Sequence, residues 1–137
     1  MNIDCAFRDK RLFAAALGDL SSWQVWITVL CAAFALPLTA EQQQIFATIA
    51  GGRLPPAKRV RELWCVAGRR SGKSHIAAAI AVYLSLFVEH RLARGERGMC
   101  LVLAGSRDQA LAVMGFVHGL LDASPALRAE IVSVSPL

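Results

Sequence analysis

Residues 67–74 read AGRRSGKS and combine two glycines with two arginines and a Lys-Ser pair. Gly68 and Gly72 allow a loop to curl so that its backbone N–H groups point inward toward an anion. Lys73 would then reach the β- and γ-phosphates of a nucleotide, while the hydroxyl of Ser74 would ligate the Mg²⁺ that bridges them. The pattern therefore predicts a binding loop for ATP and Mg²⁺. Its predicted ligand-binding residues are Gly68, Arg70, Ser71, Gly72, Lys73 and Ser74, with Ser74 also on the metal.

Ala67 departs from the general phosphate-loop motif G-x-x-x-x-G-K-[ST], which begins with glycine. The alternative interpretation of this stretch is a basic turn that only joins a strand to a helix. The flanking segments favour the phosphate loop, because apolar residues 63–67 predict a strand before it and the alanine-rich run 76–88 predicts a helix after it.

The second half of the chain alternates predicted strands and helices. Strands are predicted at 63–67, 99–104 and 131–134, and helices at 73–91 and 108–121. These strands lack polar alternation, as expected of strands that are buried on both faces. We therefore expect an α/β fold, with an incomplete P-loop NTPase-type parallel sheet and flanking helices.

The residues that precede this half predict only helices. An amphipathic helix is expected over 7–18, and an apolar helix over 23–36. Thr39 and Gln42 have the spacing of a capping box, which would begin a further helix. Two consecutive glycines at 51 and 52 would end it.

A working ATPase of this type needs an acidic residue at the end of a later strand, where it acts on Mg²⁺ and the attacking water. The acids that follow Ser74 are Glu89, Glu96, Asp108, Asp122 and Glu130, and none of them closes an apolar strand. We therefore expect residues 1–52 to form an N-terminal helical segment and residues 53–137 to be the N-terminal portion of an ATPase domain, which stops before its acidic strand. Such a chain would be part of a larger protein.

The composition suits a globular chain that binds polyanions. Hydrophobic residues make up 55% of the sequence, and the formal net charge is +5. Seven basic residues face a single acid between Arg53 and Lys73, a field that favours nucleotide phosphates and a nucleic-acid backbone. For residues 53–61, a solvated loop of ordinary arginines is the alternative.

The four cysteines, Cys5, Cys31, Cys65 and Cys100, have neither a zinc spacing nor a dense disulfide pattern. We expect them to be reduced, buried thiols in a cytosolic protein. The apolar stretches 25–36 and 76–88 are shorter than the ~20 residues that span a bilayer, so no membrane partner is expected.

Together these segments resemble the large subunit of tailed-phage terminases, the ATP-driven motor that packages DNA into procapsids. The resemblance rests on WQVWITVLCAAFALPLTAEQQQIF, LWCVAGRRSGKS, GERGMCLVLAGSRDQA and SPALRAEIVSV, which cover most of the chain. A G-R-R-x-G-K-[ST] loop with a small residue in front is common in that family, so Ala67 fits it. The resemblance implies double-stranded DNA, a portal protein and a small terminase subunit as partners, and a homo-oligomeric ring in the host cytoplasm.

The resemblance also implies roles for individual residues. Arg69 would face the γ-phosphate as the catalytic arginine, with Arg70 as the alternative. Gln42, in the LTAEQ stretch, would hydrogen-bond the adenine edge. Gln43 and Gln44 are alternatives to Gln42, and an exposed polar helix face is a further interpretation of all three.

In the same comparison, Ser106 and Arg107 would touch DNA phosphates, although a helix cap is the simpler role for Ser106. The acidic pair and the metal-dependent nuclease domain of the family would lie downstream of residue 137. We therefore expect this chain to bind ATP without turning it over and without cutting DNA. The alternatives are a catalytically incomplete prophage remnant and a partial helicase-like P-loop ATPase.

Overall fold

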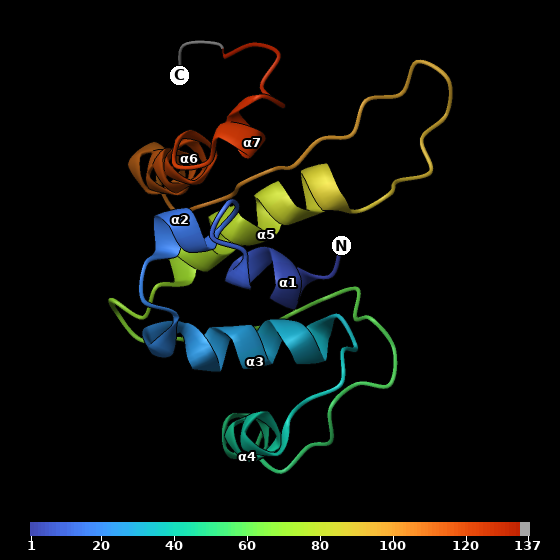
Figure 1. Cartoon of the computed structure of the whole chain (residues 1–137), viewed down its shortest axis with the longest axis vertical. Helices are drawn as coiled ribbons and strands as arrows, with labels where there is room; N and C mark the ends of the chain where they lie inside the picture. The colour runs from blue at the N-terminus through green and yellow to red at the C-terminus, as the bar shows by residue number, and fades with distance from the viewer. Residues whose placement is uncertain (135–137) are drawn as a thin grey trace.

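The computed structural model describes residues 1–134, which are built from helices and connecting segments (Figure 1). In chain order the helical elements are α1 (Ile3–Arg8), α2 (Ala14–Leu17), the 3₁₀ helix η1 (Leu20–Trp23), α3 (Gln24–Ala33), α4 (Ala40–Ile49), α5 (Lys73–Phe87), α6 (Arg107–Asp122) and α7 (Pro125–Arg128). Helices α1 and α5 lie between α3 and α6, and α4 lies on the far side of α3 (Figure 1).

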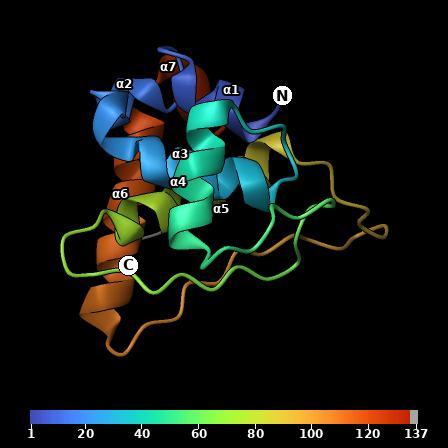
Figure 2. The ribbon, with the colours of Figure 1, turned by 90° about the horizontal axis from the view of Figure 1, so that it is seen from below.

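The predicted parallel sheet is wrong, because no β-strand forms within residues 1–134. The runs 63–67, 99–104 and 131–134 are connecting segments that share no backbone hydrogen bonds with one another. Figure 2 shows the first two of them as long traces outside the helices. A parallel sheet would bury both faces of these strands, whereas Trp64 is 89% exposed and Val66 is fully exposed. Packing between helices supplies the core that the sheet was expected to provide.

The core gathers apolar side chains from helices that are distant in sequence. It includes Phe7, Phe13, Ile27, Leu30, Ile76, Val82, Tyr83, Leu120 and Leu127. The rings of Phe7 and Phe13 meet edge to face with centroids 5.3 Å apart, an arrangement that aromatic pairs prefer. The hydroxyl of Tyr83 donates to the carbonyl of Met1 at 3.0 Å, which ties the N-terminus to α5.

The helix predicted over 7–18 is wrong, because α1 and α2 are separated by a turn. Asn2 caps α1 by accepting a hydrogen bond from the Cys5 N–H at 2.8 Å. Asp9 ends α1 in an extended conformation, and its carboxylate accepts from the Arg11 N–H at 2.8 Å. Such a local side-chain bond competes with helix continuation, which is why the amphipathic pattern was misleading here.

Helix α3 is shorter than predicted and ends at Ala33 rather than near residue 36. Ala35 adopts a positive φ of 54°, a conformation that a helix does not contain. The Leu36 N–H then donates back to the Cys31 carbonyl at 2.8 Å, which closes the helix end.

The capping box at the start of α4 is confirmed. Thr39 Oγ1 accepts from the Gln42 N–H at 3.2 Å, and Gln42 Oε1 accepts from the Thr39 N–H at 3.0 Å. Gly51 and Gly52 follow with φ values of 61° and 77°, so the predicted glycine stop after this helix is confirmed too.

Helix α5 begins at Lys73 as predicted but ends at Phe87, before the predicted residue 91. Helix α6 is confirmed, and Ser106 caps it by accepting from the Gln109 N–H at 3.3 Å. The short helix α7 begins at Pro125 after the cap residue Ser124. The first of these boundaries places the predicted phosphate loop directly before α5.

The expectation that all four thiols are buried is wrong, because only Cys31 is buried, whereas Cys5, Cys65 and Cys100 are exposed. Within residues 1–134, no helix combines the length and the apolar character needed to cross a membrane.

Candidate functional site

The predicted phosphate loop connects an exposed extended segment to the first residue of α5. Gly72 is the N-cap of that helix and has a left-handed φ of 80°, and its carbonyl accepts the first helical hydrogen bond from Ile76 at 3.0 Å. No side chain caps this helix start. The N–H groups of its first turn therefore point out of the helix without a side-chain acceptor, where the helix dipole favours an anion.

Lys73 lies folded over the loop. Its Nζ donates to the Gly68 carbonyl at 3.2 Å, although its side chain is otherwise exposed. This contact closes the loop between its first glycine and the start of α5. The ammonium group and the uncapped helix start therefore lie at the same loop, which is the charge arrangement that a phosphate group requires.

Arg69 and Arg70 form the exposed tip of the loop. Arg70 has a φ of 63°, a left-handed conformation that is uncommon for residues other than glycine. Within residues 1–134, neither guanidinium is part of an ion pair. Both side chains are therefore available to an external anion, and the structure does not single out one of them.

Ser71 differs from its neighbours because its polar atoms face the protein. Its carbonyl accepts a hydrogen bond from the indole Nε1 of Trp26 at 2.6 Å. Its Oγ is buried and has no hydrogen-bond partner among the residues that the structure describes. Ser74 lies one residue into α5 and is partly buried.

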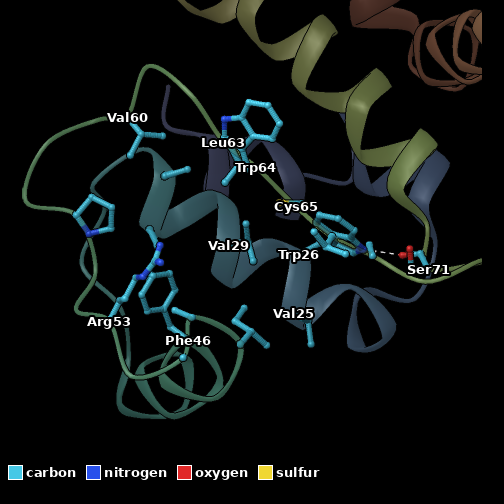
Figure 3. A pocket seen from close by; sticks show the side chains of 18 of the residues that line it. Val25, Trp26, Val29, Phe46, Arg53, Val60, Leu63, Trp64, Cys65 and Ser71 are labelled. Atoms are coloured by element: carbon cyan, nitrogen blue, oxygen red, sulfur yellow. Dashed lines mark hydrogen bonds between the residues drawn. The ribbon is translucent and has the colours of Figure 1, made fainter. Parts of the chain in front are cut away.

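A cavity of about 980 Å³ extends from the loop along α3 toward α4 (Figure 3). Gly68 and Ser71 form its end at the loop, and Trp26 and Phe46 contribute aromatic walls. Its remaining lining is largely apolar, and Arg53 and Glu62 are the charged residues in it. The volume lies in the range of ~300–1,000 Å³ that ligand pockets occupy.

Gln42 lies outside this cavity. Its side chain is buried, with Oε1 in the capping box and Nε2 directed at Cys31 Sγ, 3.9 Å away. Gln43 donates to the Leu38 carbonyl at 3.1 Å, and Gln44 is exposed. None of the three glutamines lines the space next to the loop.

Three aromatic residues at the loop were not singled out from the sequence, namely Trp23, Trp26 and His75. The His75 ring lies against Phe116 of α6 with centroids 3.6 Å apart, and against Trp23 at 5.7 Å. Partial burial lowers the pKa of His75 below its ordinary value. Two tryptophans three residues apart share one helix face, and this spacing was the available signal.

Within residues 1–134, no group of three or more His, Cys, Asp and Glu side chains is arranged to hold a metal ion. Comparisons of the chain with protein-family models, with curated proteins and with solved structures found no match. The candidate site therefore rests on the chemistry and geometry of the loop itself.

Proposed function

We propose that the chain binds the triphosphate of Mg-ATP at loop 67–74, as the ATP-binding segment of a DNA-packaging motor that resembles the large terminase subunit. The observation that carries the proposal is the position of Lys73, whose Nζ lies 3.2 Å from the Gly68 carbonyl. This ammonium group lies beside a helix start that has no side-chain cap. A bound polyphosphate would accept hydrogen bonds from both.

The residues present fit a Mg²⁺ ion that arrives with the triphosphate. Mg²⁺ keeps several waters and is commonly held by one or two protein groups together with substrate phosphates. The hydroxyl of Ser74, adjacent to Lys73, is the protein oxygen proposed for it. When bound, the ion would neutralise charge on the phosphate oxygens.

The cavity beside the loop offers room for the nucleoside. Because Gly68 and Ser71 belong to both the loop and the cavity, a triphosphate at α5 would extend its sugar and base toward Trp26. Aromatic side chains stack on nucleobases irrespective of base identity. This placement makes Gln42 unnecessary for holding the base.

Exposed basic side chains in and before the loop are proposed for the catalytic and DNA-binding roles. Arg69 would stabilise charge on the γ-phosphate, with Arg70 as the alternative, because both extend from the loop tip. Arg53, Lys58 and Arg61 are exposed in the segment before the loop and would contact the backbone of double-stranded DNA. From the terminase resemblance we also propose a portal protein and a small terminase subunit as partners, and assembly of the chain into a homo-oligomeric ring.

Calorimetric titration with Mg-ATP tests the site. Wild-type chain should bind, Lys73→Ala should lose binding, and Ser74→Ala should lose the Mg²⁺ dependence of binding. Lys58→Ala removes an exposed cation outside the loop and is the matched control, which should bind as the wild type does. Equal affinities for wild type and Lys73→Ala would contradict the proposal.

The alternative is a catalytically incomplete remnant or a partial helicase-like ATPase, which would bind nucleotide without turnover. We expect no phosphate release by the wild-type chain in excess Mg-ATP in either case, because none of the acids after Ser74 closes an apolar strand. Sustained release would contradict that expectation and indicate an active ATPase.

A further inference from the structure

We propose that Trp23 and Trp26 are positioning residues, which hold loop 67–73 in the shape that accepts a polyphosphate. The inference rests on the proposed function in one respect, namely that this loop is the phosphate site. Neither tryptophan belongs to the loop motif. Both lie at the junction of η1 and α3, about 45 residues before the loop they contact.

Trp26 acts through a hydrogen bond to the loop backbone. Its Nε1 donates to the Ser71 carbonyl at 2.6 Å, a short N–H···O distance. In a trans peptide the carbonyl of one residue and the N–H of the next point in opposite directions. Because the Ser71 carbonyl points toward Trp26, the Gly72 N–H points away from it. The Gly72 N–H makes no backbone hydrogen bond to the residues described, so it is available to an acceptor.

The orientation of this peptide matters because a carbonyl oxygen that faced a phosphate would repel it. Without the indole donor, the peptide between Ser71 and Gly72 could rotate and present its oxygen to the anion. Trp26 therefore fixes the orientation of the peptide between Ser71 and Gly72, so that its carbonyl faces the indole and its N–H points away.

Trp23 supports the neighbouring backbone by contact. Its ring atom Cζ3 lies 2.7 Å from the place that a Cβ on Gly72 would occupy, so only glycine fits there. The ring is itself anchored, because Nε1 of Trp23 donates to the Leu17 carbonyl at 3.2 Å. His75 covers the ring from α5, and Phe116 covers His75 from α6. The aromatic support of the loop thus extends over three helices.

The experiment separates the hydrogen bond from the bulk of the ring. Trp26→Phe keeps an aromatic side chain but removes the donor. The NMR order parameters of the backbone amides at 68–72 should fall from the ~0.85 of a rigid backbone toward ~0.6. Mg-ATP affinity should fall by up to about tenfold, as expected for the loss of one hydrogen bond. Helix content by circular dichroism should be unchanged. Tyr83→Phe is the matched control, because it removes one hydrogen-bond donor, to the Met1 carbonyl, from an aromatic residue outside the loop and the cavity, and it should alter neither measurement.

If Trp26→Phe does not fold, benzothienylalanine at position 26 serves instead, because it has the shape of tryptophan with sulfur in place of the N–H. Unchanged order parameters at 68–72 would overturn the inference, as would lower order parameters with unchanged Mg-ATP affinity in a wild type that binds. Lower order parameters in the variant, together with no binding by the wild type, would confirm that Trp26 holds the loop and contradict the proposed function.

Discussion

The ring of Trp23 lies where a side chain on Gly72 would have to start, since a Cβ there would be 2.7 Å from Cζ3. Gly72 also has a φ of 80°, which L-residues rarely adopt. Contact and conformation thus both require glycine at the N-cap of α5. A substitution at this position should affect the loop and the N-terminal helices together.

Gly72→Ala should destabilise the fold by about 2–5 kcal/mol, the sum of left-handed strain and overpacking against the indole. Gly95→Ala is the matched control, because Gly95 has a similar φ of 83° but nothing within 4 Å of its Cβ position. It should lose about 1–2 kcal/mol from strain alone. Urea denaturation of both variants gives the comparison. Equal losses would show that the indole contact contributes nothing.

Gln42→Ala should lower stability in the absence of any nucleotide. The substitution removes half of the capping box and leaves the Thr39 N–H without its acceptor, at a cost of about 1 kcal/mol. Gln44→Ala on the exposed face of α4 should change stability by less than about 0.5 kcal/mol. A Gln42→Ala protein that keeps its stability and loses ATP affinity would instead support a role in binding adenine.

The thiol of Cys31 should lose its proton at a higher pH than an ordinary thiol does. Burial, and then the carboxylate of Asp4, raise the pKa of Cys31 to about 11 from an ordinary value of 9.0. The folded state therefore holds this proton more tightly than the unfolded state does. The corresponding stability is fully present below pH 9 and falls as pH rises toward 11.

Thermal unfolding at pH 8 and at pH 10.5 measures this effect, and Cys31→Ala should lose less on the same change of pH. Thiol-reagent titration at pH 8 provides an independent check. Exposed Cys5, Cys65 and Cys100 should react in the native protein, and Cys31 only after denaturation. Rapid reaction of all four thiols in the native state would contradict the assigned burial.

Ser124→Ala should cost more than an ordinary cap substitution. The hydroxyl of Ser124 is fully buried, donates to the Arg11 carbonyl and accepts from the Leu127 N–H. Its loss would remove the hydrogen bond to the Arg11 carbonyl, which is only part-buried, at about 0.5–1.5 kcal/mol in addition to the cap. Ser106→Ala, at an exposed cap, should cost only about 1 kcal/mol. Similar losses for the two variants would indicate that the bond to Arg11 is not stabilising.

The helices could be predicted where their signals are local. Thr39 and Gln42, or Ser106 and Gln109, lie three residues apart, and each cap forms as the sequence pattern indicates. The strands could not be predicted in this way, because a strand requires a partner that is distant in sequence. Residues 63–67 have the composition of a buried strand, but no second segment pairs with them within the described part of the chain.

The same difference between local signals and long-range contacts applies to the candidate site. The loop motif indicated Lys73 and both glycines, because these residues are close together in the sequence. The indole of Trp26 contacts the loop across 45 residues. The spacing of Trp23 and Trp26 indicates a shared helix face, but it does not indicate which distant segment that face contacts. Gln42 was chosen for its motif, whereas its geometry is set by Thr39 and Cys31 in the folded chain.

The extended segment 99–103 affects how the protein behaves at high concentration. Met99, Leu101 and Leu103 are 87%, 71% and 82% exposed, on a backbone without hydrogen bonds to the rest of the described chain. Such an exposed run of apolar residues is a template for intermolecular β-pairing, and the flanking Arg97 and Arg107 oppose it by charge repulsion. Because salt screens that repulsion, aggregation should begin at a lower protein concentration as ionic strength rises.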